Sequence, residues 1–182
     1  AEKTALVTHQ LSYQHPPEVL HFDGKSSSNI PGTPLSDKKK APGRFDSLSP
    51  VDRYSLSLWI KPHDLTSGTI VSRQSNGRLT PGFNLQLNDG HLRFNIITNW
   101  IAGVAMVETK EKISVNEWTH LTLTFHGQLR ATNQHIFING KEASLKIIHN
   151  TNSNTGSAKK GSPLRLGGYQ DDYYHGDLRD LR

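Results

Sequence analysis

Residues 82–98 read GFNLQLNDGHLRFNIIT, and this stretch decides the fold. Three apolar side chains alternate with polar ones on each side of Asp89-Gly90: Phe83, Leu85 and Leu87 before it, and Leu92, Phe94 and Ile96 after it. Alternation with a period of two is typical of a half-buried β-strand. An Asp-Gly pair between two such runs is the strongest short signal for a β-hairpin. The stretch therefore predicts two antiparallel strands with a common apolar face.

The same period recurs along most of the chain, most clearly in residues 54–61 (YSLSLWIK). A second hairpin is predicted from strands 133–138 and 141–148 around Asn139-Gly140. Further strands are predicted at 19–22, 44–46, 69–73, 103–108, 118–126, 163–166 and 175–182. No segment shows the stripe of an amphipathic helix. About a dozen antiparallel strands in one chain predict an all-β fold, a two-sheet β-sandwich of the jelly-roll type.

Length and composition limit the class of protein. The 182 residues are the length of one domain, which can bury about two-thirds of its unfolded surface. The absence of Cys excludes disulfide scaffolds, thiolate zinc sites and cysteine nucleophiles. No apolar run approaches the roughly 20 residues of a membrane span, so we expect no membrane insertion. We assign residues 19–182 to the sandwich and residues 1–18 to an N-terminal extension or an extra strand.

The net charge of +5 is carried partly by lysines in two loop-like stretches, at residues 38–40 and 159–160. Neither run has interleaved aromatic side chains that could stack on bases, so the pattern argues against nucleic-acid binding. A basic surface leaves an anionic polysaccharide open as a ligand.

Six ordered motifs, spread from residue 22 to the last residue, resemble the laminin-G-like, concanavalin-A-like jelly-roll family: FDGK (22–25), YSLSLWIKP (54–62), NEWTHLTLTF (116–125), IFINGK (136–141), PLRLGG (163–168) and HGDLRDLR (175–182). Residues 82–109 and the insertion GQLRATNQ (127–134) also resemble a branch found in large exported bacterial proteins. The resemblance implies an exported, periplasmic or cell-surface parent whose other domains would be partners. Members of the family sometimes hold a structural calcium ion at the rim, for which Asp23 and Asp180 are candidates if the terminal strands pair. The alternative is that Asp23 forms a turn with Gly24 and Asp180 is solvated.

The carboxylate pattern argues against catalysis. Glycoside hydrolases need two carboxylates about 5 to 9 Å apart across the scissile bond. Hydrolases of the resembled fold carry Glu-x-Asp-x-(x)-Glu on a strand, and lyases carry Arg-x-Glu-x-Arg; neither pattern is present. The ten His residues lack the spacing of a transition-metal site, and we expect no required cofactor.

Sugar binding needs flat aromatic faces beside planar polar side chains. The richest such cluster is GGYQDDYYHGD at residues 167–177, with five candidates in Tyr169, Asp171, Asp172, Tyr173 and Tyr174. Trp100 follows a strand break and is a further candidate, whereas Trp59 and Trp118 are expected to pack. Arg73 and Arg78 would bind a carboxylate or sulfate. Tyrosines at strand ends also cap sandwich cores, which is the competing interpretation.

The sequence thus favours a non-catalytic binding module of a larger exported protein, with a carbohydrate as its ligand. The alternative is a structural or protein-interaction module that packs against other domains of the parent. The fold by itself does not distinguish between the two.

Overall fold

The computed structural model describes residues 18–30, 53–74, 80–99, 102–151 and 162–182. The predicted strand at 44–46, the N-terminal extension up to residue 17 and both lysine runs lie outside the described residues.

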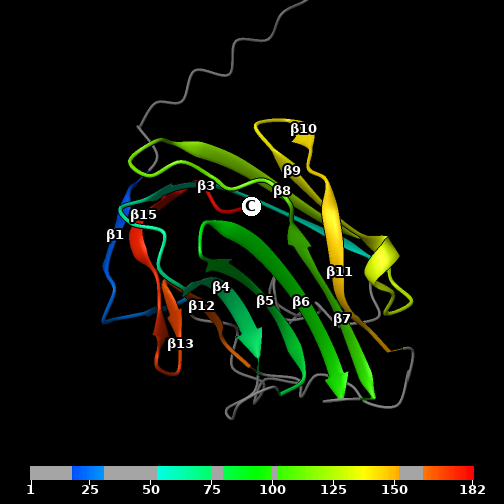
Figure 1. Cartoon of the computed structure of the whole chain (residues 1–182). Coiled ribbons are helices and arrows are strands. Elements are labelled where there is room, and N and C mark those ends of the chain that lie inside the picture. The colour runs from blue at the N-terminus through cyan, green and yellow to red at the C-terminus, as the bar shows by residue number, and fades with distance from the viewer. Residues whose placement is uncertain (1–17, 31–52, 75–79, 100–101, 152–161) are drawn as a thin grey trace, which may run out of the picture.

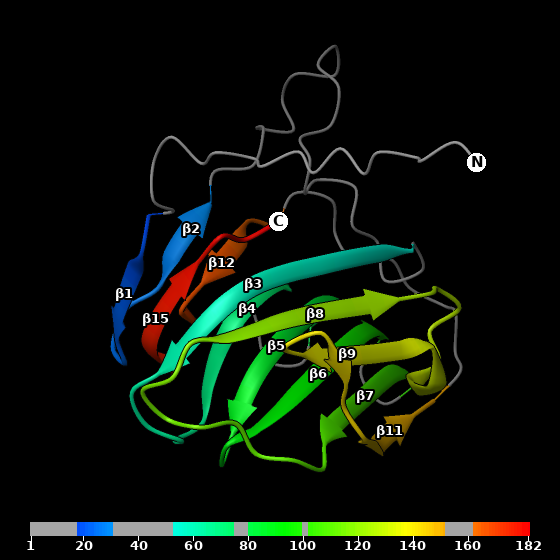
Figure 2. The same cartoon turned by 90° about the horizontal axis from the view of Figure 1, so that it is seen from above.

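Two antiparallel sheets pack face to face as a β-sandwich (Figures 1 and 2). Sheet A has six strands in the order β1 (Leu20–Asp23), β15 (His175–Arg179), β3 (Tyr54–Pro62), β8 (Thr119–Phe125), β9 (Gln134–Ile138) and β10 (Lys141–Glu142). The all-β sandwich that the sequence predicts is confirmed.

Sheet B follows the order β11 (Leu145–Asn150), β7 (Gly103–Thr109), β6 (His91–Asn99), β5 (Gly82–Asn88), β4 (Gly68–Gln74), β12 (Leu164–Leu166) and β2 (Ser28–Ile30). Two short strands, β13 (Gly168–Tyr169) and β14 (Asp172–Tyr173), form a hairpin beside β4. The one helical turn in the described ranges is η1 (Ala131–Asn133), and no helix in them is long and apolar enough to cross a membrane.

The hairpin of β5 and β6 has the register that its sequence predicts. Asp89 and Gly90 both have positive φ angles, which a tight hairpin turn requires. Three apolar pairs face each other across it: Phe83 with Ile96, Leu85 with Phe94, and Leu87 with Leu92. All six side chains are buried between the sheets. The polar residues of both strands consequently lie on the outer face of sheet B.

The second predicted hairpin is wrong over most of its length. β10 pairs with β9 over only two residue pairs, and the chain then crosses to sheet B, where β11 pairs with β7 (Figure 1). Leu145 is partly buried against the core after this crossing, whereas Ile147 and Ile148 of β11 are exposed. The Asn139-Gly140 turn fixes where the chain reverses, but β7 offers a longer partner than β9.

Three short strands, β2, β13 and β14, were missed by the sequence analysis. β2 lies in the Ser/Gly-rich segment after β1 and pairs with β12. β14 makes a single parallel bridge, between Tyr173 and Thr69. Strands of two or three residues are too short to show alternation, so their sequences carry no period.

Glycine is required at the start of β5. Gly82 has φ of +140°, and a Cβ atom there would lie 1.9 Å from the carbonyl oxygen of Arg73 on β4. Gly140, in the turn between β9 and β10, has φ of +79° but no atom within 4 Å of such a Cβ. The two glycines share a positive φ and differ in crowding.

We expect Gly140→Ala to cost about 1 kcal/mol, the penalty of a side chain at positive φ. Gly82→Ala should cost more than about 3 kcal/mol, because the backbone of β4 must also move. Urea denaturation of both variants measures the difference. Equal losses would show that the β4–β5 contact is not tight.

Candidate functional site

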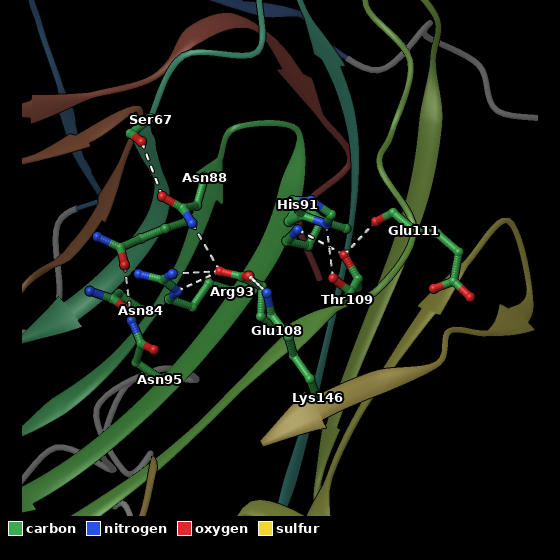
Figure 3. Close-up of polar contacts among 12 residues, drawn as sticks. Ser67, Asn84, Asn88, His91, Arg93, Asn95, Glu108, Thr109, Glu111 and Lys146 are labelled. Atoms are coloured by element: carbon green, nitrogen blue, oxygen red, sulfur yellow. Dashed lines mark hydrogen bonds and ion pairs between the residues drawn. The ribbon is translucent and has the colours of Figure 1, made fainter. Parts of the chain in front are cut away.

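Polar side chains form cross-strand rows on the outer face of sheet B (Figure 3). One row runs over five neighbouring strands and consists of Thr69, Gln86, Arg93, Glu108 and Lys146. The next row contains Ser72, Asn84, Asn95 and Met106. The alternation that buries Leu and Phe inside the sandwich sets both rows on the opposite face.

A groove of about 570 Å³ lies over these rows, with the β13–β14 hairpin as one wall. Side-chain amides are the most frequent group in its described lining, which consists of Gln74, Asn84, Gln86, Arg93, Asn95, Ile97, Met106, Tyr169, Gln170, Asp171 and Asp172. This volume lies within the range of small-ligand sites, about 300 to 1,000 Å³.

Asp172 fixes how the amides of the groove are oriented. Its Oδ2 accepts hydrogen bonds from Thr69 Oγ1 at 2.6 Å and from Gln86 Nε2 at 2.9 Å. An ionised carboxylate only accepts, so Gln86 must turn its nitrogen toward Asp172 and its oxygen toward Asn95. Asn95 Nδ2 accordingly donates to Gln86 Oε1 at 2.9 Å.

The orientation of Asn95 in turn determines the orientation of the amides next to it, Asn84 and Gln74. Asn95 Nδ2 also donates to Asn84 Oδ1, which obliges Asn84 to donate through Nδ2 to Gln74 Oε1 at 3.0 Å. Gln74 Nε2 in turn donates to the carbonyl oxygen of Thr80. Each amide in this series of hydrogen bonds thus has one defined orientation, which is set by the Asp172 carboxylate at its beginning.

One acceptor in this network is left over. Asn95 is 4% exposed and uses its nitrogen for two hydrogen bonds, while its Oδ1 has no hydrogen-bond partner among the described residues. Buried polar atoms are nearly always paired, so this acceptor requires a donor from a water molecule or from the hydroxyl of a ligand. This atom cannot turn away without breaking the bonds to Asn84 and Gln86.

Glu108 is shared by two cations beside the groove, Arg93 and Lys146. Its Oε2 lies 2.6 Å from Arg93 Nη2, and its Oε1 lies 2.6 Å from Lys146 Nζ (Figure 3). Asn88 Nδ2 donates to the same carboxylate at 2.9 Å. Burial alone would raise the pKa of Glu108, but the bonds from Lys146, Asn88 and Arg93 lower it further than burial raises it. Glu108 is therefore ionised at neutral pH.

Three of the residues predicted to bind sugar line the groove, namely Tyr169, Asp171 and Asp172. Asp171 is exposed at the tip of the hairpin. Tyr169 shows little of its ring, because the ring is stacked under the Arg165 guanidinium and its hydroxyl is within 3.1 Å of Thr80 Oγ1. The contribution of Tyr169 to the groove is therefore small in area.

The other described candidates lie elsewhere. Tyr174 is 1% exposed and belongs to the core, and burial together with the charge of Asp177 raises the pKa of its hydroxyl far above the ordinary value. Tyr173 packs its ring against Gly168. Arg73 is 5% exposed and its Nε donates to the carbonyl oxygen of Ser162. Tyr174 is therefore part of the sandwich core, which is the alternative to sugar contact that the sequence left open.

The remaining tryptophan and arginine candidates, Trp100 and Arg78, lie outside the described residues. Trp59 and Trp118 are on the outer side of sheet A, where the Arg179 guanidinium lies 5.1 Å and 4.3 Å from their ring centroids. The sequence predicts that these two tryptophans pack against the protein. In the structure, both rings pack against the Arg179 guanidinium.

The two candidate calcium ligands do not share a site. β1 and β15 pair as expected, but the register sets Asp23 opposite His175 and Leu20 opposite Leu178. Asp180 therefore lies beyond the far end of this ladder, about 15 Å from Asp23 at the rise of a β-strand. Asp23 accepts bonds from Lys25 and Ser26, and Asp180 pairs with Arg182. No group of three His, Asp or Glu side chains suited to a metal occurs in the part of the chain that the structure describes.

The amides of the floor, Gln74, Asn84, Gln86 and Asn95, were missed by the sequence analysis. For three of them the signal was present in residues 82–98, whose outward positions are mostly Asn and Gln, although Asn is depleted in strands. Aromatic side chains, by contrast, are concentrated in the Tyr-rich segment 167–177. That loop supplies one wall of the groove, and the β5–β6 hairpin together with Gln74 of β4 supplies the amides of its floor.

Acid should remove the stabilising effect of Glu108. A lowered pKa contributes stability that is complete above the ordinary value of 4.5 and is lost as pH falls through the folded-state pKa. Glu108→Gln should therefore cost about 3 kcal/mol at pH 7 and progressively less below pH ~4. Urea denaturation from pH 7 to pH 3 measures this, with the exposed Glu111→Gln as control. A pH-independent difference would contradict the ion-pair account.

Comparisons with known proteins agree with this architecture. The family model described as the concanavalin A-like lectin/glucanases superfamily matches residues 32–182. No curated protein matches the sequence.

Solved structures share the fold at low sequence identity. The heptameric SAP-like pentraxin from Limulus polyphemus is 16% identical with a TM-score of 0.58, and the match covers 90% of this chain and 74% of that one. Domains LG4-5 of the mouse laminin α1 chain are 16% identical with a TM-score of 0.57, over 92% and 40% of the two chains. The CBM40 of the Ruminococcus gnavus IT-sialidase, bound to α2,3 sialyllactose, is 12% identical with a TM-score of 0.59, over 90% and 88%. With the family model covering most of its length, the chain belongs to the concanavalin A-like lectin/glucanase superfamily, as a laminin-G-like jelly-roll domain.

Proposed function

We propose that this domain is a carbohydrate-binding module and that the groove on the outer face of sheet B is its binding site. The observation that carries the proposal is the amide network with its leftover acceptor, Asn95 Oδ1. Sugar hydroxyls both donate and accept hydrogen bonds, and planar amides held in one orientation suit them. Preorganised side chains also lose little entropy on binding.

Apolar contact is available beside the polar network. Met106 on β7 and the largely buried Ile97 on β6 line the groove. A sugar ring has C–H groups on its faces and hydroxyls at its edges, so an apolar side next to an amide side matches both. Of the known structures similar in fold, one is a module with a bound sialylated sugar, which supports a glycan as the class of ligand.

We further propose that the domain is not a catalyst and that its parent protein is exported. A general acid at neutral pH needs a raised pKa, whereas that of Glu108 is lowered by its ion pairs. Asp172 Oδ2 already accepts hydrogen bonds from Thr69 and Gln86, which engages that oxygen within the protein. The laminin and CBM40 neighbours support export, since domains of these kinds are usually extracellular.

A second candidate function is docking to another domain of the parent. The exposed Ile147, at 52%, and its neighbour Ile148 favour it, because both lie on the edge strand β11. Edge strands with apolar side chains pair readily with other chains.

A glycan microarray with neutral and acidic glycans tests the proposed function. We expect selective binding that is reduced at least about tenfold by Asn95→Ala, which removes the free acceptor and both donors. The exposed Asp171→Ala should weaken binding without affecting the fold. Thr122→Ala, on the outer face of sheet A, is the matched control and should bind as the wild type does.

Binding that survives both groove variants would contradict this location of the site. Absence of binding to every glycan, with the wild type folded, would contradict the function and favour docking through β11.

A further inference from the structure

We infer that the groove selects an uncharged, hydroxyl-rich glycan and discriminates against carboxylated or sulfated ones. The inference rests on the proposed function and specifies the ligand class of the same site. It comes from the charges and the hydrogen-bonding capacity that the groove presents to a ligand.

The charges of the groove oppose those of the whole chain. The formal net charge of the protein is +5, yet the groove lining contains two carboxylates, Asp171 and Asp172, and one cation, Arg93. Arg93 turns both Nε and Nη2 toward Glu108 Oε2, at 2.8 Å and 2.6 Å. One of the two edges with which Arg holds a carboxylate or sulfate, that of Nε and Nη2, is therefore already occupied.

The other cations that the structure describes near the groove also have partners. Lys146 pairs with Glu108, and Arg73 is buried. Arg165 stacks on the Tyr169 ring and donates to the carbonyl oxygen of Gln74. Among the described residues, Asp171, Asp172 and Glu108 outnumber the cations Arg93 and Lys146, so an anionic ligand would meet a net negative charge at the groove.

The hydrogen-bonding atoms lead to the same ligand class. Asn95 Oδ1 and the Asp171 carboxylate can only accept, so they require donors from the ligand. Gln86 Nε2 and Asn84 Nδ2 each use one hydrogen within the network and keep a second one to donate. Hydroxyl groups satisfy both kinds of atom, whereas a carboxylate or sulfate group satisfies only the donors.

Affinity electrophoresis in gels containing matched polymers tests this inference. Hydroxyethyl cellulose, laminarin, galactomannan and arabinoxylan would each be compared with their carboxymethylated forms at low salt. We expect a neutral polymer to be retained and its carboxymethylated form to bind at least about tenfold more weakly. Asp171→Lys should reduce this ratio to about threefold or less, and 0.5 M NaCl should also reduce it, because salt screens exposed charges.

The outcomes separate this inference from the proposed function. Equal or tighter binding of a carboxymethylated polymer that is lost in Asn95→Ala would overturn the selectivity and leave the glycan site standing. Retention of none of the polymers, neutral or charged, would overturn the inference together with the proposed function.

Discussion

The strict alternation of residues 82–98 is the constraint on which both the sandwich and its groove depend. Because side chains of a strand point alternately to its two faces, a slip of one residue would exchange every Leu and Phe with an Asn, Gln or Arg. The pairing of Leu85 with Phe94 places the apolar set inside, and the same register places Gln86 beside Arg93 outside. One hairpin thus supplies six side chains of the core and three of the four amides of the groove floor.

A single carboxylate then orders the outer face. Asp172 comes from the β13–β14 hairpin, far along the chain from the β5–β6 hairpin, and its acceptor-only chemistry orients the amides one after another. On β7, Glu108 fixes the orientation of two cations by forming ion pairs with Arg93 and Lys146. Polar networks of this kind are rigid when they are satisfied, and rigidity is what a binding surface for hydroxyl groups requires.

Local patterns in the sequence predicted the fold well and the site only in part. The period of two gives strands and faces, so β3 and the β5–β6 hairpin could be predicted residue by residue. The crossing of β11 to sheet B depends on which strand offers a longer partner, which no local pattern records. The Tyr-rich loop was predicted to bind sugar as a whole, but its residues have different roles in the structure. Tyr174 lies in the core, and Asp172 contacts a strand more than 80 residues earlier. Such long-range contacts are invisible to spacing.

The central claim, that the oriented amides of sheet B contact the ligand, is tested most directly by NMR. Side-chain amide resonances of ¹⁵N-labelled protein would be followed while the best glycan of the microarray is added. The account predicts that the NH₂ signals of Asn84, Gln86 and Asn95 shift together and saturate at one affinity, while the indole signals of Trp59 and Trp118 stay in place. Shifts confined to those indoles, or to residues of β11, would contradict it.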